Sequence, residues 1–248
     1  MDAAVYRAHA ELERDHWWFV GRRAVVGDVL ERHVGTRVGR ILDVGCGTGG
    51  MLPLLARFGD VTALEPEPFA VDHARRQPVE AEVVLGRVPE DVPATADFDL
   101  VTAFDVIEHL EDDVGALRSM ASATRPGGTV LVTVPALPWL WSEHDVANGH
   151  FRRYRRRDLA RVLDEAGMDV RHLSFFNAVL FAPIAAVRLV GRLRRAERPG
   201  RSDFDMGLPP KPVNRLLAGL LGGERRLVSG RGLRLGVSLI AVARVGPS

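Results

Sequence analysis

Residues 43–50, which read Asp-Val-Gly-Cys-Gly-Thr-Gly-Gly, constrain the fold of this chain more than any other feature. The run follows an apolar segment at 40–44 that predicts a strand, and it opens a helical pattern at 50–58. Glycines allow positive φ angles and let a ligand approach the backbone closely. The N-terminus of a helix adds free N–H groups and partial positive charge. The run therefore predicts a strand–turn–helix unit that holds a ligand.

The rest of residues 38–134 alternates short β-rich runs with helical patterns, which is typical of βαβ units and a parallel sheet. With 248 residues, the chain is long enough for one large domain or for one domain with an insertion. Seven strands are predicted, at 40–44, 61–65, 82–86, 98–104, 129–134, 170–176 and 236–245. Helices are predicted at 3–33, 50–58, 69–77, 113–124, from Asp158 to Gly167, and at about 178–193 and 213–228.

Composition excludes several classes of protein. Apolar residues make up 46% and charged residues 26% of the chain, so global disorder is excluded. The net charge of +1 gives no case for nucleic-acid binding. Cys46 is the single cysteine, which excludes an intramolecular disulfide framework. The longest apolar run, 175–187, is too short to span a bilayer, and no signal peptide is visible, so we expect a cytoplasmic protein.

The glycine-rich run fits two cofactor templates. Gly45-x-Gly47-x-x-Gly50 fits a dinucleotide fingerprint, and Asp43-x-Gly45-x-Gly47-x-Gly49 fits a loop that binds S-adenosylmethionine (SAM). Glu65 ends the second predicted strand, 20 residues after Gly45, where a carboxylate can accept both ribose hydroxyls of either cofactor. The glycines and the acid therefore leave an oxidoreductase and a SAM-dependent protein both open.

Two further blocks favour SAM. Residues 98–110 read Phe-Asp-Leu-Val-Thr-Ala-Phe-Asp-Val-Ile-Glu-His-Leu, and Arg-Pro-Gly-Gly at 125–128 precedes the strand at 129–134. In order and spacing, these blocks resemble class I SAM-dependent methyltransferases over about residues 38–175. The resemblance implies an α/β, Rossmann-like doubly wound sheet of seven strands whose last strand is antiparallel. A nicotinamide enzyme would lack an evident Tyr-x-x-x-Lys pair, because the sole lysine is Lys211.

The resemblance implies nine cofactor-binding residues: Asp43, Gly45, Gly47, Gly49, Glu65, Arg87, Val88, Phe104 and Asp105. The glycines would pass under the methionine part of SAM, Glu65 would hold the ribose, and Asp43 would order the loop or meet the ammonium group through water. The segment around Arg87 would lie by the adenine, although the family usually has an acid or amide there. Phe104 and Asp105 would face the reactive methyl group.

The segment 135–154 supplies the catalytic candidates, because in this fold it follows a strand at the ligand edge of the sheet. His144, beside Asp145, and His150 are the candidate general bases, since histidine titrates near neutral pH. His109 is a third candidate. The candidate substrate-binding residues are Arg152, Arg153, Tyr154 and Trp18. The alternative is a surface loop whose polar side chains satisfy one another.

Two further resemblances concern a metal and the N-terminus. Asp105-x-x-Glu108-His109, with a later histidine such as His150, resembles the divalent-metal arrangement of small-RNA 2′-O-methyltransferases, and its first part resembles ubiquinone-biosynthesis O-methyltransferases. Whether a metal is used stays open. Residues 16–23, His-Trp-Trp-Phe-Val-Gly-Arg-Arg, resemble the N-terminal signature of a bacterial methyltransferase group. That resemblance implies a helix closing over the cofactor, with Arg22 meeting its carboxylate; aromatic packing is the compatible alternative.

Four parts are expected: an N-terminal helical cap at 1–36, a SAM-binding core at 37–177, a helical insertion at 178–230 and the final core strand at 231–248. The insertion, with arginines at 188, 192, 194, 195, 198 and 201, could cap an acceptor pocket, form a dimer face or contact a membrane surface peripherally. The expected function is SAM-dependent methyl transfer to oxygen, or to nitrogen, of a small-molecule or lipid-like acceptor, in a setting such as secondary metabolism. A non-catalytic SAM-binding protein and an NAD-dependent oxidoreductase are the alternatives.

Overall fold

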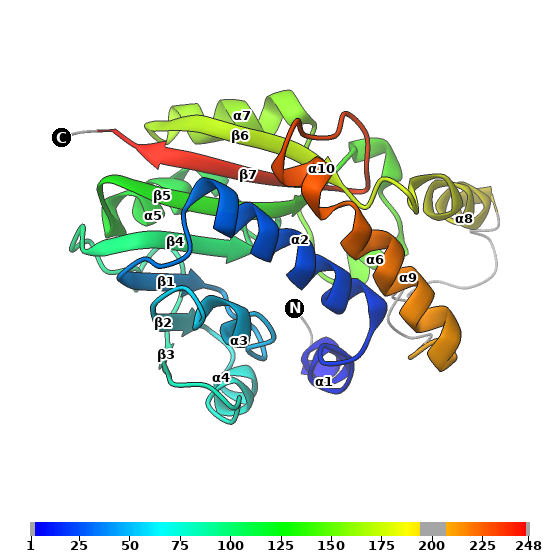
Figure 1. The fold of residues 1–248 in the computed structure, drawn as a ribbon, viewed down its shortest axis with the longest axis horizontal. Coiled ribbons are helices and arrows are strands. Elements are labelled where there is room, and N and C mark those ends of the chain that lie inside the picture. The colour runs from blue at the N-terminus through cyan, green and yellow to red at the C-terminus, as the bar shows by residue number, and fades with distance from the viewer. Residues whose placement is uncertain (1–2, 194–206, 247–248) are drawn as a thin grey trace.

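A computed structural model describes residues 3–193 and 207–246, and its centre is a seven-stranded sheet (Figure 1). The strands are β1 (Arg40–Val44), β2 (Asp60–Glu65), β3 (Ala81–Leu85), β4 (Phe98–Phe104), β5 (Thr124–Pro135), β6 (Met168–Phe176) and β7 (Ser238–Val245). Their order is β3-β2-β1-β4-β5-β7-β6, and β7 runs antiparallel to both of its neighbours. The predicted fold class, with an antiparallel last strand, is confirmed.

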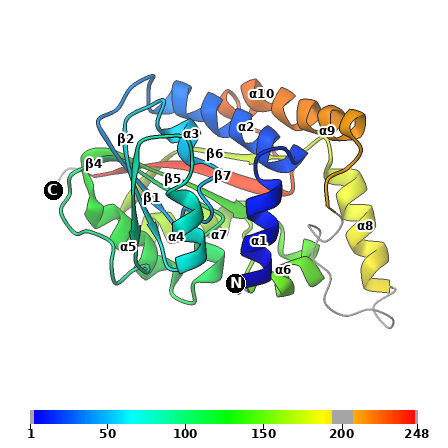
Figure 2. The same ribbon diagram turned by 90° about the horizontal axis from the view of Figure 1, so that it is seen from below.

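Helices cover both faces of the sheet. Their bounds are α1 (Ala3–Leu12), α2 (Trp17–His33), α3 (Leu52–Leu55), α4 (Pro68–Ala74), α5 (Asp113–Ala123), α6 (Glu143–Ala147), α7 (Arg156–Glu165), α8 (Phe181–Leu193), α9 (Lys211–Gly223) and α10 (Arg225–Ser229). Figure 2 shows α2, α9 and α10 along one face and α5 and α7 on the other. In the same view α1, α6 and α8 lie toward the same end of the sheet.

Alternating side chains of the central strands build the two halves of the core. Leu42 and Val44 of β1 pack in one buried cluster with residues of α5 and α7, whereas Ile41 packs in the other with residues of α2. Successive side chains of a strand point to opposite faces. A parallel sheet covered on both faces therefore needs the nearly continuous apolar strands that this sequence carries.

Some boundaries differ from those predicted. The N-terminal segment forms two helices, because His16 caps α2: its Nδ1 accepts a hydrogen bond from the backbone N–H of Trp18 (3.3 Å). The helix expected to be capped by Asp158 has its N-cap three residues earlier, at Arg155, so that Asp158 lies in the first turn of α7. Its negative charge is favourable there, beside the partial positive charge of the helix N-terminus.

The C-terminal half shows two more differences. Strand β5 includes residues 125–128, predicted as a turn, because its pairing with β4 shifts register between Phe98 and Leu100 and the extra residues bulge out. The helix predicted at 213–228 is divided into α9 and α10 at Glu224. None of the described helices is long and apolar enough to cross a membrane. Four arginines of the predicted insertion, at 194, 195, 198 and 201, lie outside the described residues.

Helices α9 and α10, which lie between β6 and β7, pack on α2 (Figure 1). Gly21 of α2 lies close to α9, since an added Cβ would lie 2.6 Å from Cγ of Leu221. Asn214 of α9 fixes the start of α2, because its side chain accepts a hydrogen bond from the N–H of Trp17 (2.8 Å) and donates one to the carbonyl of Asp15 (2.7 Å). Helix α9, which follows β6 in the chain, is therefore fixed to the start of α2.

We expect Gly21→Ala to destabilise the protein by about 1–3 kcal/mol, because the new methyl group would overlap the buried Leu221. Gly219→Ala in α9 is the matched control: an added Cβ there meets nothing within 4 Å, and alanine favours a helix over glycine by up to about 1 kcal/mol. The measurement is urea unfolding of both variants. Equal effects of the two substitutions would contradict the close packing of α2 on α9.

Candidate active site

A cavity of about 970 Å³ lies at the carboxyl ends of β1, β2, β4 and β5. Its size lies in the range of pockets that enclose a drug-sized ligand, roughly 300–1,000 Å³. The predicted site residues that line it are Trp18, Asp43, Gly45, Gly47, Glu65, Arg87, Val88, Phe104, Asp105, His109, His144, His150 and Arg153. The chain's own side chains therefore leave room for a ligand beside the glycine-rich loop.

The glycine-rich loop turns as its sequence requires. Gly45, Gly47 and Gly49 have φ angles of 70°, 57° and 91°, values that side-chain-bearing residues rarely adopt. An added Cβ at Gly47 would meet nothing within 4 Å, so the loop is open at that residue. Gly49 does not line the cavity; an added Cβ there would lie 3.0 Å from Cα of Ala74, which makes this glycine necessary for packing against α4.

Glu65 joins three segments at the floor of the cavity. Its carboxylate accepts hydrogen bonds from the N–H of Gly47 (2.8 Å), the N–H of Glu67 (3.1 Å) and the hydroxyl of Tyr6 in α1 (2.9 Å). Burial raises the pKa of Glu65, and these hydrogen bonds oppose that rise. The acid therefore stands at the end of β2 where a ribose would be held, within reach of the N-terminal helix.

The two N-terminal helices roof the cavity. Glu13, at the end of α1, accepts hydrogen bonds from the Thr48 hydroxyl and from the Gln77 side-chain amide (2.9 Å). Arg22 of α2 forms an ion pair with Asp105, directly after β4. Neither Tyr6 nor Glu13 was predicted as a site residue, because each meets its partner only through tertiary folding and no local pattern marks it.

Buried polar atoms without a partner concentrate in this cavity. Among the described residues, Arg22 Nε, Asp43 Oδ2, both carboxylate oxygens of Glu108, and Asn177 Oδ1 are buried and make no hydrogen bond, and all four residues line the cavity. Native proteins seldom leave such atoms unpaired, and those that remain need an explanation. A ligand with polar groups supplies one.

These residues fit SAM. Asp43 offers an unused carboxylate oxygen to an ammonium group, and Arg22 offers an unused N–H to a carboxylate. Burial raises the pKa of Asp43 to about 7, although the hydrogen bond from the Thr102 hydroxyl (2.7 Å) acts against the rise. A bound cation would favour the ionised form of this acid. The cradle thus offers groups of the right charge for both ends of an amino acid, and Glu65 for a ribose.

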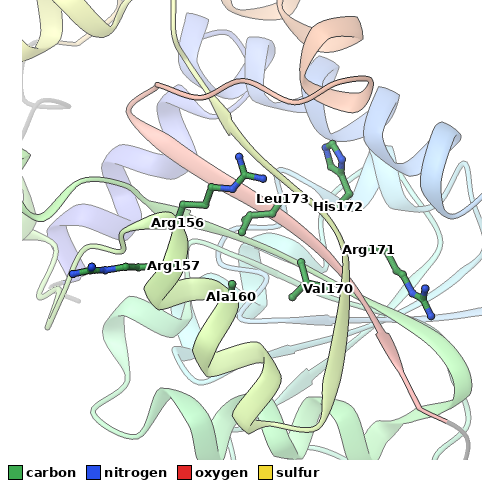
Figure 3. A pocket seen from close by; sticks show the side chains of 7 residues that line it. All are labelled: Arg156, Arg157, Ala160, Val170, Arg171, His172 and Leu173. Atoms are coloured by element: carbon green, nitrogen blue, oxygen red, sulfur yellow. The ribbon is translucent and has the colours of Figure 1, made fainter.

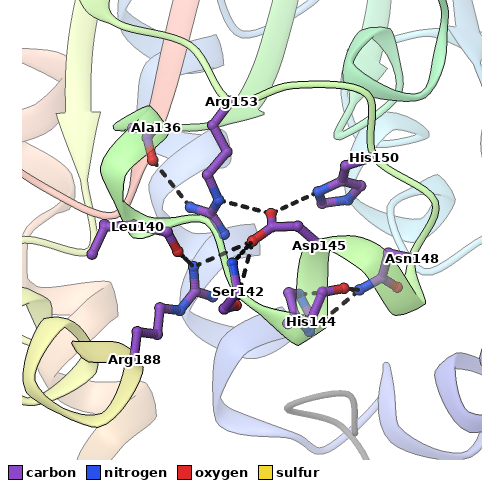
Figure 4. Close-up of polar contacts among 9 residues, drawn as sticks. All are labelled: Ala136, Leu140, Ser142, His144, Asp145, Asn148, His150, Arg153 and Arg188. Carbon is purple, nitrogen blue, oxygen red and sulfur yellow. Dashed lines mark hydrogen bonds and ion pairs between the residues drawn. The ribbon is translucent and has the colours of Figure 1, made fainter. Parts of the chain in front are cut away.

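A second set of contacts centres on Asp145, whose side chain is fully buried (Figure 4). The carboxylate accepts hydrogen bonds from Nδ1 of His150 (2.9 Å), Nε of Arg153 (2.7 Å) and the N–H of Ser142 (2.8 Å). Burial alone would raise the pKa of Asp145, but the His150 hydrogen bond and the Arg153 charge hold it well below its usual range. The histidine that contacts Asp145 is therefore His150, whereas His144, the neighbour of Asp145 in sequence, contacts Asn148.

The two other candidate histidines both lie near His150. The ring centroids of His109 and His150 lie 4.6 Å apart, and those of His144 and His150 lie 6.3 Å apart. Burial, and then the nearby His150, lower the pKa of His109 to about 3, so that His109 is neutral at physiological pH. Potential ligand atoms of Glu108, His109 and His150 lie within 4.8 Å of one another. Asp105, the fourth residue of the metal resemblance, instead contacts Arg22.

Two of the predicted substrate-binding residues lie elsewhere. The hydroxyl of Tyr154 donates a hydrogen bond to Asp113 (2.7 Å), and Arg152 forms an ion pair with the same carboxylate (3.0 Å). Neither residue lines the cavity. Arg153 does line it, but its guanidinium group is engaged by Asp145 and by the carbonyl of Ala136 (3.0 Å). Arg152 and Tyr154 thus have structural contacts that account for them.

A second hollow, of about 520 Å³, lies between α7 and β6 on another side of the protein. Figure 3 shows that its three arginines, Arg156, Arg157 and Arg171, point in different directions and do not converge. The His172 ring is held by the carbonyl of Val228 (2.7 Å). This hollow therefore lacks the convergent polar groups of a built site.

Comparison with known proteins identifies the family. The profile of a methyltransferase domain family matches residues 20–173, more than half of the chain. The chain therefore belongs to this family of methyltransferase domains, which agrees with the sequence resemblance. Its cofactor is accordingly SAM, and the cradle described above fits that molecule.

Individual relatives agree with this assignment. A ubiquinone biosynthesis O-methyltransferase from Xanthomonas campestris pv. campestris is 37% identical over 112 residues, which cover 43% of this chain and 47% of the relative. The match thus spans about half the length of that relative. A solved putative methyltransferase from Bacillus halodurans has a TM-score of 0.60 at 17% identity, covering 90% of this chain and 98% of that one. The [4+2]-cyclase SpnF has a TM-score of 0.57 at 20% identity, covering 92% and 81%. At these identities the structural likeness shows the fold alone.

We expect Tyr154→Phe to destabilise the protein by about 1–3 kcal/mol, because the buried Asp113 carboxylate loses its hydroxyl donor. The affinity for SAM should stay unchanged, since Tyr154 does not line the cavity. Urea unfolding and calorimetric titration measure the two quantities. A variant of full stability with weakened ligand binding would restore Tyr154 to the binding residues.

Proposed function

We propose that this chain transfers a methyl group from SAM to an oxygen atom, or secondarily a nitrogen atom, of a small-molecule or lipid-like acceptor, with His150 as general base. The observation that supports this most is that one cavity is lined both by the glycine-rich loop with Glu65 and by the buried Asp145–His150 pair. Cofactor-binding groups and a base thereby share one enclosed space.

The cofactor side of the cavity has a positioning task. SAM supplies an electrophilic methyl group on its sulfonium, so the protein must align an acceptor atom and exclude water, and alignment can lower the barrier by roughly 7–11 kcal/mol. Glu65 and Gly47 would hold the nucleoside, while Asp43 and Arg22 would hold the amino-acid end. The roof of α1 and α2 excludes water through Tyr6 and Glu13.

His150 would take the proton of the acceptor. Asp145 accepts a hydrogen bond from Nδ1 of His150, which leaves the lone pair of the neutral ring on Nε2. Arg153 keeps Asp145 ionised and in place. His109, held neutral beside His150, adds no second positive charge to the site. Asp145 is thus a positioning residue, and His150 is the base.

The acceptor end of the cavity supports an acceptor with an apolar part. It is lined by Trp18 of α2 and by apolar residues of the segment between β6 and β7: Leu180, Pro183, Ile184, Val187 and Leu217. We therefore propose that residues 1–36 and 178–230 act as cap and insertion around a core formed by 37–177 and 231–248. A cytoplasmic location, a role in secondary metabolism, the absence of a nucleic-acid partner and a peripheral membrane contact stay predictions.

Glu65→Gln should weaken the binding of SAM and S-adenosylhomocysteine about tenfold or more, because a charge-assisted hydrogen bond is lost. Glu82→Gln, the same change on an exposed residue of β3, is the matched control and should leave the affinity unchanged. Isothermal titration calorimetry gives both dissociation constants. If the unaltered chain binds neither compound, the proposed function is rejected.

His150→Gln should lower the rate of methyl transfer about 10²-fold or more, the usual contribution of a general base. Asp145→Asn should also slow the reaction, because the His150 ring loses the carboxylate that orients it. Asp169→Asn, on an exposed acid of β6, is the control. The assay uses tritium-labelled SAM with a panel of phenols, carboxylic acids and amines.

The same assay separates the base from a metal. A rate that is insensitive to EDTA supports His150 as base. Loss of turnover in EDTA, restored by a divalent ion, would instead favour the cluster of Glu108, His109 and His150 as a metal site that acidifies the acceptor. Binding of SAM without turnover of any acceptor would favour the non-catalytic alternative.

A further inference from the structure

Asn177 is a polar residue of the cavity that neither the cofactor nor the base explains. It follows β6 directly, is 1% exposed, and lines the cavity together with Leu180 and Ser238. Its Oδ1 is buried and accepts no hydrogen bond among the described residues. The glycine-rich loop follows β1, and Glu65 is the last residue of β2. Asn177 instead follows β6, the strand at one edge of the sheet.

The backbone around Asn177 is held in an uncommon conformation. Asn177 has a φ angle of 58°, in the left-handed region that asparagine tolerates better than most residues but that still needs support. The support comes from Glu224, a buried acid between α9 and α10. Its carboxylate accepts hydrogen bonds from the N–H groups of Ala178 (3.0 Å) and Val179 (2.6 Å). The position of the Asn177 side chain is therefore set by a contact 46 residues further along the chain.

A fixed, buried amide oxygen without a partner selects for a hydrogen-bond donor. A site built around such a group rejects an analogue that lacks the donor, because the polar atom would then be left unpaired. The proton of the reacting acceptor group is the one that His150 would remove, so that proton is not available to Asn177. A hydroxyl has only one proton, so a hydroxyl acceptor must present a second donor.

We propose that Asn177 is a specificity-determining residue whose amide oxygen accepts a hydrogen bond from a hydroxyl or N–H of the acceptor other than the one whose proton His150 would remove. This inference rests on the proposed function, and it narrows the acceptor to molecules with at least two hydrogen-bond donors. The residue that selects the acceptor then lies after the end of β6, and Arg152 and Tyr154 do not take part in that selection.

The test measures binding with defined probes. Catechol, resorcinol and hydroquinone, each with its dimethyl ether, are titrated into the whole chain saturated with S-adenosylhomocysteine, and chemical-shift titration gives the affinities. The variants are Asn177→Gly, which suits the positive φ angle and removes the amide, and Asn177→Asp, which keeps an oxygen acceptor and also tolerates that φ angle. Melting temperatures and S-adenosylhomocysteine affinities of both variants control for folding.

At least one dihydroxybenzene should bind about tenfold or more tightly than its dimethyl ether. Asn177→Gly should reduce that advantage to the part that the hydroxyl at His150 contributes and should leave the affinity of the ether within about twofold, whereas Asn177→Asp should retain the whole advantage. Binding of all probes independent of Asn177, loss of the advantage in Asn177→Asp, or no binding of any dihydroxybenzene overturns the inference. Failure of S-adenosylhomocysteine to bind the unaltered chain would reject the proposed function instead.

A double variant tests whether two donors are involved. If Asn177 and His150 contact different hydroxyls, the losses of affinity in Asn177→Gly and His150→Gln should multiply in the combined variant. If the combined variant binds no more weakly than either single variant, one hydroxyl serves both residues, and the requirement for a second donor is overturned.

Discussion

The hydrogen bonds to the Glu65 carboxylate are the contacts on which the rest of the site depends. They join the end of β2 to the turn after β1 through Gly47, and both to α1 through Tyr6. A carboxylate that is 2% exposed is costly to bury unless its oxygens are hydrogen-bonded. The glycine-rich turn is therefore held by an acid from the neighbouring strand, and the N-terminal helix is held by the same acid. Loop, strand and roof form one unit.

The sheet was predictable because its signals are local. The runs at 40–44 and 98–104 became β1 and β4 with the same bounds, and the glycines at 45, 47 and 49 adopt the positive φ angles that their sequence requires. The antiparallel direction of the last strand came from the resemblance and was confirmed. The sequence pattern did not predict the helix caps correctly. His16 caps α2 and so divides the N-terminal helix, and Asp158 lies inside α7 and does not cap it.

The site residues were predictable only where they belong to a local sequence motif or directly follow a predicted strand. Asp43, Glu65 and the histidines were found in the sequence and line the cavity. The partner of each side chain could not be read from spacing: Asp145 is beside His144 in the chain, but its carboxylate contacts His150, five residues away. Tyr6 was missed because its role depends on a contact with Glu65, 59 residues away. Asn177 was missed because its backbone is held through the contact of Ala178 with Glu224, 46 residues further along the chain.

Glu224 has a consequence for how such a chain can diversify. It fastens the junction of α9 and α10 to the backbone that follows Asn177, while α9 itself packs on α2, which supplies Trp18 and Arg22. Sequence changes between β6 and β7 can therefore reshape the acceptor wall without passing through the turn after β1 or through Glu65. The groups that would hold the methyl donor at the turn after β1 and at Glu65 therefore lie apart from the part of the cavity wall that the residues between β6 and β7 supply.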